Sequence, residues 1–327
     1  MNLEKEFMSN NIDLRDMVTV IIRSIGERTE QLCHSLIATQ VPSENIHIVG
    51  EVPFSITLEK TYKIGLQENR KWTLCIDSDV LVKSGTIKEL IGFAETCPEE
   101  VFEVNALAID KFLVSPREVG QRLYRTSSLD LALEHVHAAR TELRPETFIV
   151  DKIIETGLRQ EHANVIVGIH DFEQSYRDIF RKVFIHTKKH RDAGVAADYR
   201  LWEKYSNFDE DFKVALAAYD LATKYSDSVM IDRDAKFMAL FDEVLDKLKL
   251  IEKDSLSPGK STSFELVSAI LNDHLLMYKV LQKENPSLYR DLKSKGFLKK
   301  LIRRIAHIRL RKDRKLVKLF GITFVDS

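Results

Sequence analysis

The stretch WTLCIDSDVLV, residues 72–82, is the most informative part of this chain because an apolar run ends there in two acidic residues. Residues 72–76 predict a buried strand, and Asp77, Ser78 and Asp79 follow it directly. Where a strand continues, side chains two residues apart point to the same face, so the two carboxylates can hold a Mg²⁺ or Mn²⁺ ion together. The same triplet also fits a turn with two solvated or capping aspartates. The predicted strands and helices on either side of residues 72–82 help to decide between these two interpretations.

Strands and helices alternate on both sides of this stretch. In chain order the pattern predicts a strand at 17–22, a helix at 30–39, a strand at 46–49, a helix at 58–67, the strand at 72–76, a helix at 86–96 and a strand at 101–109. Such alternation is typical of an α/β fold with a mostly parallel sheet flanked by helices. Ligands of these sheets bind at the carboxyl ends of the strands, where Asp77 and Asp79 would lie.

The second half of the chain has a different character. Beyond about Gly168 the helical period dominates, with one apolar stripe through residues 237–248 and another from Phe264 to Lys283. We therefore predict two regions, an α/β domain at 1–190 and a helical C-terminal region at 191–327 that ends in a basic amphipathic helix.

The order of these parts resembles the nucleotide-binding half of glycosyltransferases of the A-type fold (GT-A), particularly those of the family 2 type. The resemblance spans residues 17–190 and is carried by VTVIIRSIGERTEQLCHSLIATQ at 18–40, LEKTYKIGLQENRKWTLCIDSDVLV at 58–82 and VGQRLYRTSSLDLAL at 119–133. It implies a GT-A-like fold, in which the domain at 1–190 binds the nucleotide sugar and carries out catalysis. It also implies a metal-dependent hexosyltransferase. Such an enzyme would move a sugar from a UDP or GDP type donor to a saccharide or lipid-linked acceptor, in the synthesis of a surface polysaccharide or glycolipid.

Two other functions remain open from the residues. A nucleotidyltransferase shares a similar α/β core and acidic metal site, but it usually has a glycine-rich phosphate loop with a lysine near the first strand. The corresponding stretch, residues 23–29, contains only Gly26. The other alternative is a non-catalytic scaffold that supports a helix docked on a membrane or a partner.

The resemblance also implies which residues bind the nucleotide sugar. Arg23, Ser24 and Glu27 would line the nucleotide pocket after the first strand, although an ordinary polar loop also accounts for them. Glu51 is the candidate for contact with the base, Lys60 can approach the diphosphate, and Asp77 can reach the ribose. Together the implied nucleotide-binding set is Arg23, Ser24, Glu27, Glu51, Lys60 and Asp77.

The stretch VIVGIHDFE, residues 165–173, supplies candidates for a third metal ligand and for a general base. His170 would join Asp77 and Asp79 on a Mn²⁺ or Mg²⁺ ion, with His186 as the second choice. Asp171 is the preferred base and Glu173 the next, because a base that deprotonates an acceptor hydroxyl must lie within hydrogen-bond reach of it. We expect these residues to open a helix, where acids in the first turn are also favoured by the helix dipole.

The net charge of −1 hides a strong asymmetry. Residues 293–318 contain twelve Lys or Arg and one acid, Asp313, so this segment carries +11 and the rest of the chain −12. Its apolar residues recur every three or four positions, which predicts a cationic amphipathic helix suited to an anionic membrane surface. Packing of the helix on the acidic body of the chain is the alternative. A nucleic-acid partner is not expected, and homo-oligomer formation remains open.

The cysteines and the lengths of the apolar runs indicate in which cellular compartment the protein is expected. The three cysteines form no CxxC pair or disulfide framework, which favours a reducing environment. No run of 18 apolar residues occurs, and the N-terminal residues alternate charged with apolar side chains. These features predict a cytoplasmic protein, with peripheral contact at the inner face of the membrane.

Overall fold

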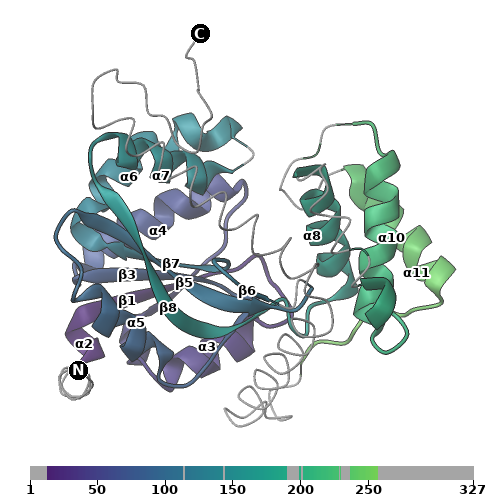
Figure 1. The fold of residues 1–327 in the computed structure, drawn as a ribbon, viewed down its shortest axis with the longest axis horizontal. Coiled ribbons are helices and arrows are strands. Elements are labelled where there is room, and N and C mark those ends of the chain that lie inside the picture. The colour runs from purple at the N-terminus through teal and green to yellow at the C-terminus, as the bar shows by residue number, and fades with distance from the viewer. Residues whose placement is uncertain are drawn as a thin grey trace, which may run out of the picture. The chain divides into compact units, whose positions relative to one another are not determined.

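Apolar, β-branched runs form the centre of an eight-stranded sheet in the computed structural model (Figure 1). The strands follow the order β2 (Ile46–Val49), β1 (Val18–Arg23), β3 (Trp72–Asp77), β7 (Gln121–Arg125), β5 (Val101–Asp110), β8 (Arg159–His170) and β4 (Val80–Val82), and β6 (Ser115–Arg117) pairs with β5. The structure describes residues 13–112, 115–142, 144–189, 199, 202–227, 229 and 236–256.

The predicted α/β fold, a sheet flanked by helices, is confirmed, and the sheet is a mixed one. Strands β1, β2, β3, β5 and β8 run in one direction, while β4, β6 and β7 run against them. The antiparallel strands were not predicted because they lack a clear local signal. β4 has three residues, and β7 reads QRLYR, in which charged and apolar residues are mixed.

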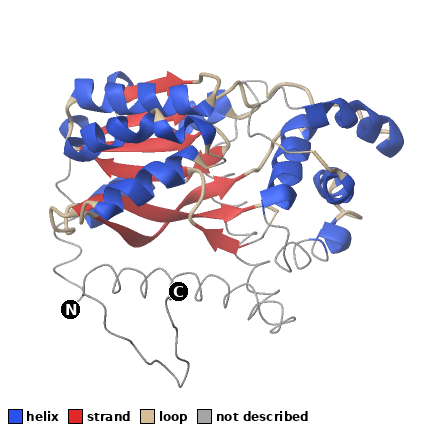
Figure 2. Cartoon of the chain, turned by 90° about the horizontal axis from the view of Figure 1, so that it is seen from above, coloured by secondary structure: helices blue, strands red, loops and turns tan. Residues whose placement is uncertain are grey.

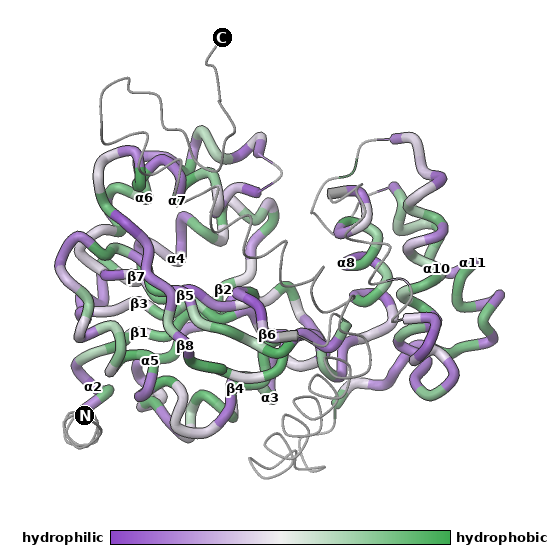
Figure 3. Tube along the Cα trace, viewed as in Figure 1, coloured by the Kyte–Doolittle hydropathy of each residue, from purple (hydrophilic) through white to green (hydrophobic). Residues whose placement is uncertain are grey.

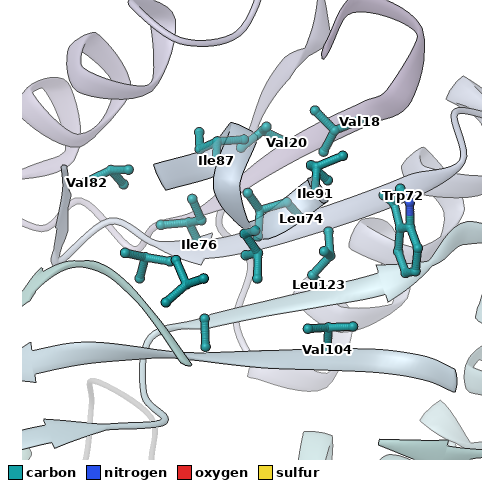
Figure 4. Close-up of a cluster of buried hydrophobic side chains, with 14 of the residues drawn as sticks. Val18, Val20, Trp72, Leu74, Ile76, Val82, Ile87, Ile91, Val104 and Leu123 are labelled. Atoms are coloured by element: carbon teal, nitrogen blue, oxygen red, sulfur yellow. The ribbon is translucent and has the colours of Figure 1, made fainter. Parts of the chain in front are cut away.

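Two layers of helices cover the two faces of the sheet (Figure 2). Along β3, Leu74 and Ile76 face one cluster and Cys75 faces the other, as the two-residue period of a strand requires. The first cluster includes residues of α3 (Glu30–Ala38) and α5 (Thr86–Ala94), and Figure 4 shows its side chains. The second includes residues of α4 (Phe54–Glu68), α6 (Leu129–Val136) and α7 (Pro145–Glu155). A short helix, α2 (Leu14–Met17), precedes β1.

After β8 the described residues form helices, as the apolar periodicity predicts. These are α8 (Tyr176–Lys189), α10 (Glu210–Lys224) and α11 (Leu240–Leu248), with a 3₁₀ turn at Lys236–Ala239. Aromatic rings join them, with Phe184 stacked on Phe237 at 4.3 Å between centroids and Phe180 against Phe241 at 5.7 Å. Hydrophobic and hydrophilic residues alternate along α10 (Figure 3), whereas β1, with the sequence VTVIIR, is largely hydrophobic.

Residue contacts divide the chain into two units, residues 1–277 and 278–327. The predicted boundary near 190 and the basic segment 293–318 lie outside the described residues, as does the stripe Phe264–Lys283, so these remain predictions. Within the described part of the chain, no helix is both long enough and apolar enough to cross a bilayer.

Candidate functional site

Charged or ionisable residues stand at the ends of four of the strands that share one direction. β1 ends at Arg23, β3 at Asp77, β5 at Asp110 and β8 at His170. Arg23 is in register with Asp77, and Asp110 with His170, so these ends lie at neighbouring positions along one edge of the sheet. Charged side chains at the carboxyl ends of parallel strands mark the usual ligand-binding edge of an α/β sheet.

Asp79, His170 and Asp171 form a buried group whose ligand atoms all lie within 4.8 Å of one another. Nε2 of His170 lies 3.6 Å from Oδ1 of Asp79, and Nδ1 lies 3.0 Å from Oδ2 of Asp171. The pairing of β4 with β8 brings these residues together, since Val80 is in register with His170 and the Asp171 amide donates to the Asp79 carbonyl at 3.1 Å.

Two buried atoms of this group have no hydrogen-bond partner, Oδ1 of Asp79 and Nδ1 of His170. The nearest carboxylates, Asp110 at 3.3 Å and Asp171 at 3.0 Å, approach Nδ1 without hydrogen-bond geometry. An unsatisfied buried carboxylate oxygen is costly, so such atoms usually point to a ligand or an ion. Two carboxylates and an imidazole are a donor set that suits a divalent metal ion such as Mn²⁺.

Lys182 of α8 reaches the same carboxylates from outside the sheet. Its Nζ contacts Oδ2 of Asp79 and lies 2.5 Å from Oδ1 of Asp171. Burial alone would lower the pKa of Lys182, but the charges of Asp171 and Asp79 outweigh it and raise that pKa above its ordinary value. Burial alone would raise the pKa of Asp171, yet His170 and Lys182 hold it well below the usual range. Lys182 and Asp171 are therefore both charged near neutral pH.

The imidazole of His170 is also held in its charged form. Burial alone would lower its pKa, but the charges of Asp171 and Asp79 and the contact with Asp110 raise the pKa well above the ordinary value. Asp110 also contacts Arg117 at 3.2 Å and accepts from the Phe112 amide at 2.9 Å. Asp110 directly follows the strand predicted at 101–109, as Asp77 follows the strand at 72–76. The position after a strand, which made Asp77 a candidate, could therefore have predicted Asp110 as well.

Asp77 belongs to a second group, centred on Arg23. The Arg23 guanidinium donates to Oδ1 of Asp77 at 2.8 Å and to Oε1 of Glu146 at 2.6 Å. Glu146, in the first turn of α7, also accepts from the Tyr124 hydroxyl at 2.8 Å and lies 3.1 Å from Nε of Arg122. The structure therefore places Asp79 with His170 and Asp171, and Asp77 with Arg23. Glu146 and Lys182 come from helices distant in the sequence and have no local signal.

Glu27 ties the loop after β1 to the Asp77–Asp79 turn. Its Oε2 accepts from the Ser24 hydroxyl at 3.0 Å, the Ile25 amide at 2.8 Å and the Ser78 hydroxyl at 2.8 Å. The structure thus brings Arg23, Ser24 and Glu27 to the strand ends. Glu51 and Lys60 pair with each other, with 41% and 51% of their side chains exposed.

The expectation that His170, Asp171 and Glu173 open a helix is wrong. His170 ends β8, because that strand pairs with β4 and β5, and α8 begins only at Tyr176. Asp171 and Glu173 have φ values of 62° and 58°, which are left-handed conformations that a helix start does not use. Glu173 pairs with Arg28 at 2.6 Å and is 40% exposed. His186 lies on α8, outside the group of Asp79, His170 and Asp171.

Gly120 lets the chain pass close to the His170 ring. Its φ is 68°, and a Cβ at this position would lie 2.5 Å from Cγ2 of Val80 and 2.9 Å from Cδ2 of His170. The Gly120 carbonyl accepts from the Asp77 amide at 2.8 Å. Any side chain here would therefore press on the imidazole and on the turn that carries both aspartates.

No protein-family profile and no curated protein matches this chain. Solved structures do match it. One is a glycosyltransferase involved in the glycosylation of the major capsid of PBCV-1, at 12% identity and a TM-score of 0.30, over 45% of this chain and 82% of that one. Another is a mannosyltransferase from Pyrobaculum calidifontis in complex with GDP-Man and Mn²⁺, at 11% identity and a TM-score of 0.29, over 85% and 92%.

A third matching structure is a CMP:2-keto-3-deoxy-manno-octonic acid synthetase complexed with CTP, at 10% identity and a TM-score of 0.31, over 47% of this chain and 92% of that one. Sugar transferases and a nucleotidyltransferase thus both occur among the similar structures.

Proposed function

We propose that this chain is a metal-dependent glycosyltransferase that moves a sugar from a nucleoside diphosphate sugar to a saccharide or lipid-linked acceptor. The observation that carries the proposal is the buried group of Asp79, His170 and Asp171 at the carboxyl ends of the strands, with an Asp79 oxygen that no hydrogen bond satisfies. An acidic group in this place is suited to an anionic ligand that arrives with a cation.

Asp79, His170 and Asp171 are the residues that would hold the ion, and His170 would release a proton on binding it, because a ligating imidazole is neutral. A bound Mn²⁺ or Mg²⁺ would supply Lewis-acid neutralisation of the diphosphate as it leaves. The imidazole in the donor set favours Mn²⁺, because Mg²⁺ prefers oxygen ligands alone. Asp77 remains a candidate for the same ion or for the ribose, since 35% of its side chain is exposed although Arg23 holds one of its oxygens.

The donor nucleotide would lie along the ends of β1, β2 and β3. Arg23, Ser24 and Glu27 shape this edge through their contacts with one another and with the Asp77–Asp79 turn. Glu51 follows β2 and, like Lys60, is partly exposed, so we propose contact of Glu51 with the base and of Lys60 with a phosphate. Glu51 and Lys60 pair with each other, so each would have to give up that contact to bind the nucleotide.

Asp171 and Glu173 remain the candidates for the base that deprotonates the acceptor. The pKa of Asp171 lies well below the usual range because His170 and Lys182 outweigh the effect of its burial, which favours a ligand role over proton abstraction. Glu173 is 40% exposed and lies two residues away in the same loop. We therefore favour Glu173 as the base, if transfer proceeds with inversion.

Release of nucleoside diphosphate from a panel of nucleotide sugars, with and without Mn²⁺, tests the proposal. We expect Mn²⁺-dependent UDP or GDP release by the wild-type chain, loss of release in Asp79→Ala, and unchanged release in Asp151→Ala, which alters an exposed residue of α7. Pyrophosphate release from a nucleoside triphosphate and a sugar phosphate would instead identify a nucleotidyltransferase. No thermal response to any nucleotide with metal would favour the scaffold.

A further inference from the structure

The Lys182 ammonium pairs with carboxylates that a metal ion at this site would need. It contacts Asp79 and Asp171, which are two of the three residues of the candidate cation group. The side chains of Asp79 and Asp171 are only 7% and 9% exposed, so little water shares these carboxylates with the ammonium. Two positive charges a few ångströms apart in such a buried place repel each other strongly.

The backbone of Lys182 is held in place by the packing and capping of α8. The first amides of α8, at Tyr176 and Arg177, donate to the Glu252 carboxylate at 2.7 and 3.0 Å. On either side of Lys182, Ile179, Phe180, Val183 and Phe184 are buried. The lysine side chain itself is 21% exposed and has a four-carbon flexible stem, so its head can leave the carboxylates while the helix stays in place.

We propose that Lys182 is an intramolecular competitor for the cation site, which pairs with Asp79 and Asp171 in the metal-free chain and is displaced from them when a divalent cation binds. The inference rests on the proposed cation site and on no assumption about donor or acceptor. It explains how buried carboxylates remain tolerable without metal, since an unpaired buried charge is strongly destabilising. The affinity of the site for a metal ion would then depend on Lys182 of α8.

Calorimetric titration of the full chain with Mn²⁺ alone tests this proposal. We expect Lys182→Met to bind Mn²⁺ at least about tenfold more tightly than the wild type, because no ammonium has to be displaced. Lys188→Met is the matched control. It lies on the same helix, where its Nζ donates to the Tyr225 carbonyl, and should leave the affinity unchanged.

Equal or weaker Mn²⁺ binding by folded Lys182→Met would overturn the inference. The titration contains no nucleotide or sugar, so its result does not depend on whether the glycosyltransferase assay succeeds. Likewise, a titration that shows no difference between the variants leaves the outcome of the nucleotide-sugar screen unaffected.

Amine labelling of the wild type gives a second measurement that does not require the variant to fold. The chain is treated briefly with acetic anhydride, with and without saturating Mn²⁺, and the acetylation of each lysine is quantified by mass spectrometry. We expect labelling of Lys182 to rise several-fold with Mn²⁺ while that of Lys188 stays constant. Unchanged or reduced labelling of Lys182, or the absence of any Mn²⁺ binding, would contradict displacement.

Discussion

At the scale of single residues, Asp77 and Asp79 show how far a motif can be interpreted from sequence. Asp77 still belongs to β3 and pairs with Arg23, whereas Ser78 and Asp79 form the turn into β4. The turn breaks the two-residue alternation, so the aspartates enter different groups. The sequence singled out residues 77–79 and the stretch at 165–173, but left open whether 77–79 continue the strand or form a turn. The Asp79–Lys182 contact joins residues 103 positions apart, and no local pattern predicts it.

Single substitutions of Asp171 and Glu173, the two acids after β8, distinguish a metal ligand from a general base. We expect Asp171→Asn to weaken Mn²⁺ binding, and Glu173→Gln to leave Mn²⁺ binding intact while lowering kcat by about 10²-fold or more, the usual contribution of a general base. Mn²⁺ titration together with steady-state kinetics measures both. Glu134→Gln, at an exposed position of α6, serves as control. A normal kcat in Glu173→Gln would remove Glu173 from the mechanism.

Gly120→Ala tests the close approach of the backbone to His170. Its new Cβ would press on Val80 and His170, so we expect a lower melting temperature and several-fold weaker Mn²⁺ binding. Gly85→Ala is the matched control because its φ of 77° carries the same backbone cost, with no atom within 4 Å of a new Cβ. Equal losses in both variants would mean that the contact with the imidazole is unimportant.

At the scale of elements, the strands and helices with strong apolar periods were predictable. β1, β2, β3 and β5 begin and end within one residue of the ranges expected from sequence. β4 and β7 were missed because their pairing partners, β8 and β3, are distant in the chain and supply the stabilising contacts. The start of α8 was misplaced because two left-handed residues precede it.

Helix α7 contributes Glu146 to the network around Arg23, and this contact is expected to control stability. Glu146→Gln removes the carboxylate that Arg23 and Arg122 share, while Arg23 keeps Asp77 and Arg122 keeps Glu103, so the free energy of unfolding should fall by about 2 kcal/mol. Chemical denaturation measures the change. Glu155→Gln at the exposed end of the same helix should stay within about 0.5 kcal/mol of the wild type.

The pH dependence of this difference follows from the pKa of Glu146. Burial alone would raise that pKa, but Arg23 and Arg122 outweigh it, so the folded-state pKa is lower than the unfolded-state value. The carboxylate therefore contributes stability above the unfolded pKa and loses it as the pH falls through the folded one. The gap between wild type and Glu146→Gln should shrink below about pH 4. A gap that is constant from neutral pH to the acid limit would contradict an ionic origin.

At the scale of the whole molecule, charge is distributed unevenly along the chain. The segment 293–318 carries +11 and the remainder −12, and the segment lies outside the described residues. We predict that the full chain binds vesicles rich in anionic lipid, since each basic residue near such a surface contributes about 1 kcal/mol. Co-sedimentation should fall as salt screens the attraction and should be absent with zwitterionic vesicles. Equal binding to both vesicle types would exclude an electrostatic anchor.

The central claim is that the strand-end group of Asp79, His170 and Asp171 binds a divalent cation that a nucleoside diphosphate then shares. Calorimetric titration of UDP and GDP into the full chain, with Mn²⁺ or with a chelator, tests it most directly, alongside the same titrations of Asp79→Asn. We predict binding of at least one nucleotide in the presence of Mn²⁺, with loss of that binding in the chelator and in Asp79→Asn. Nucleotide binding that is equally tight without metal, or no nucleotide binding under any of these conditions, would contradict it.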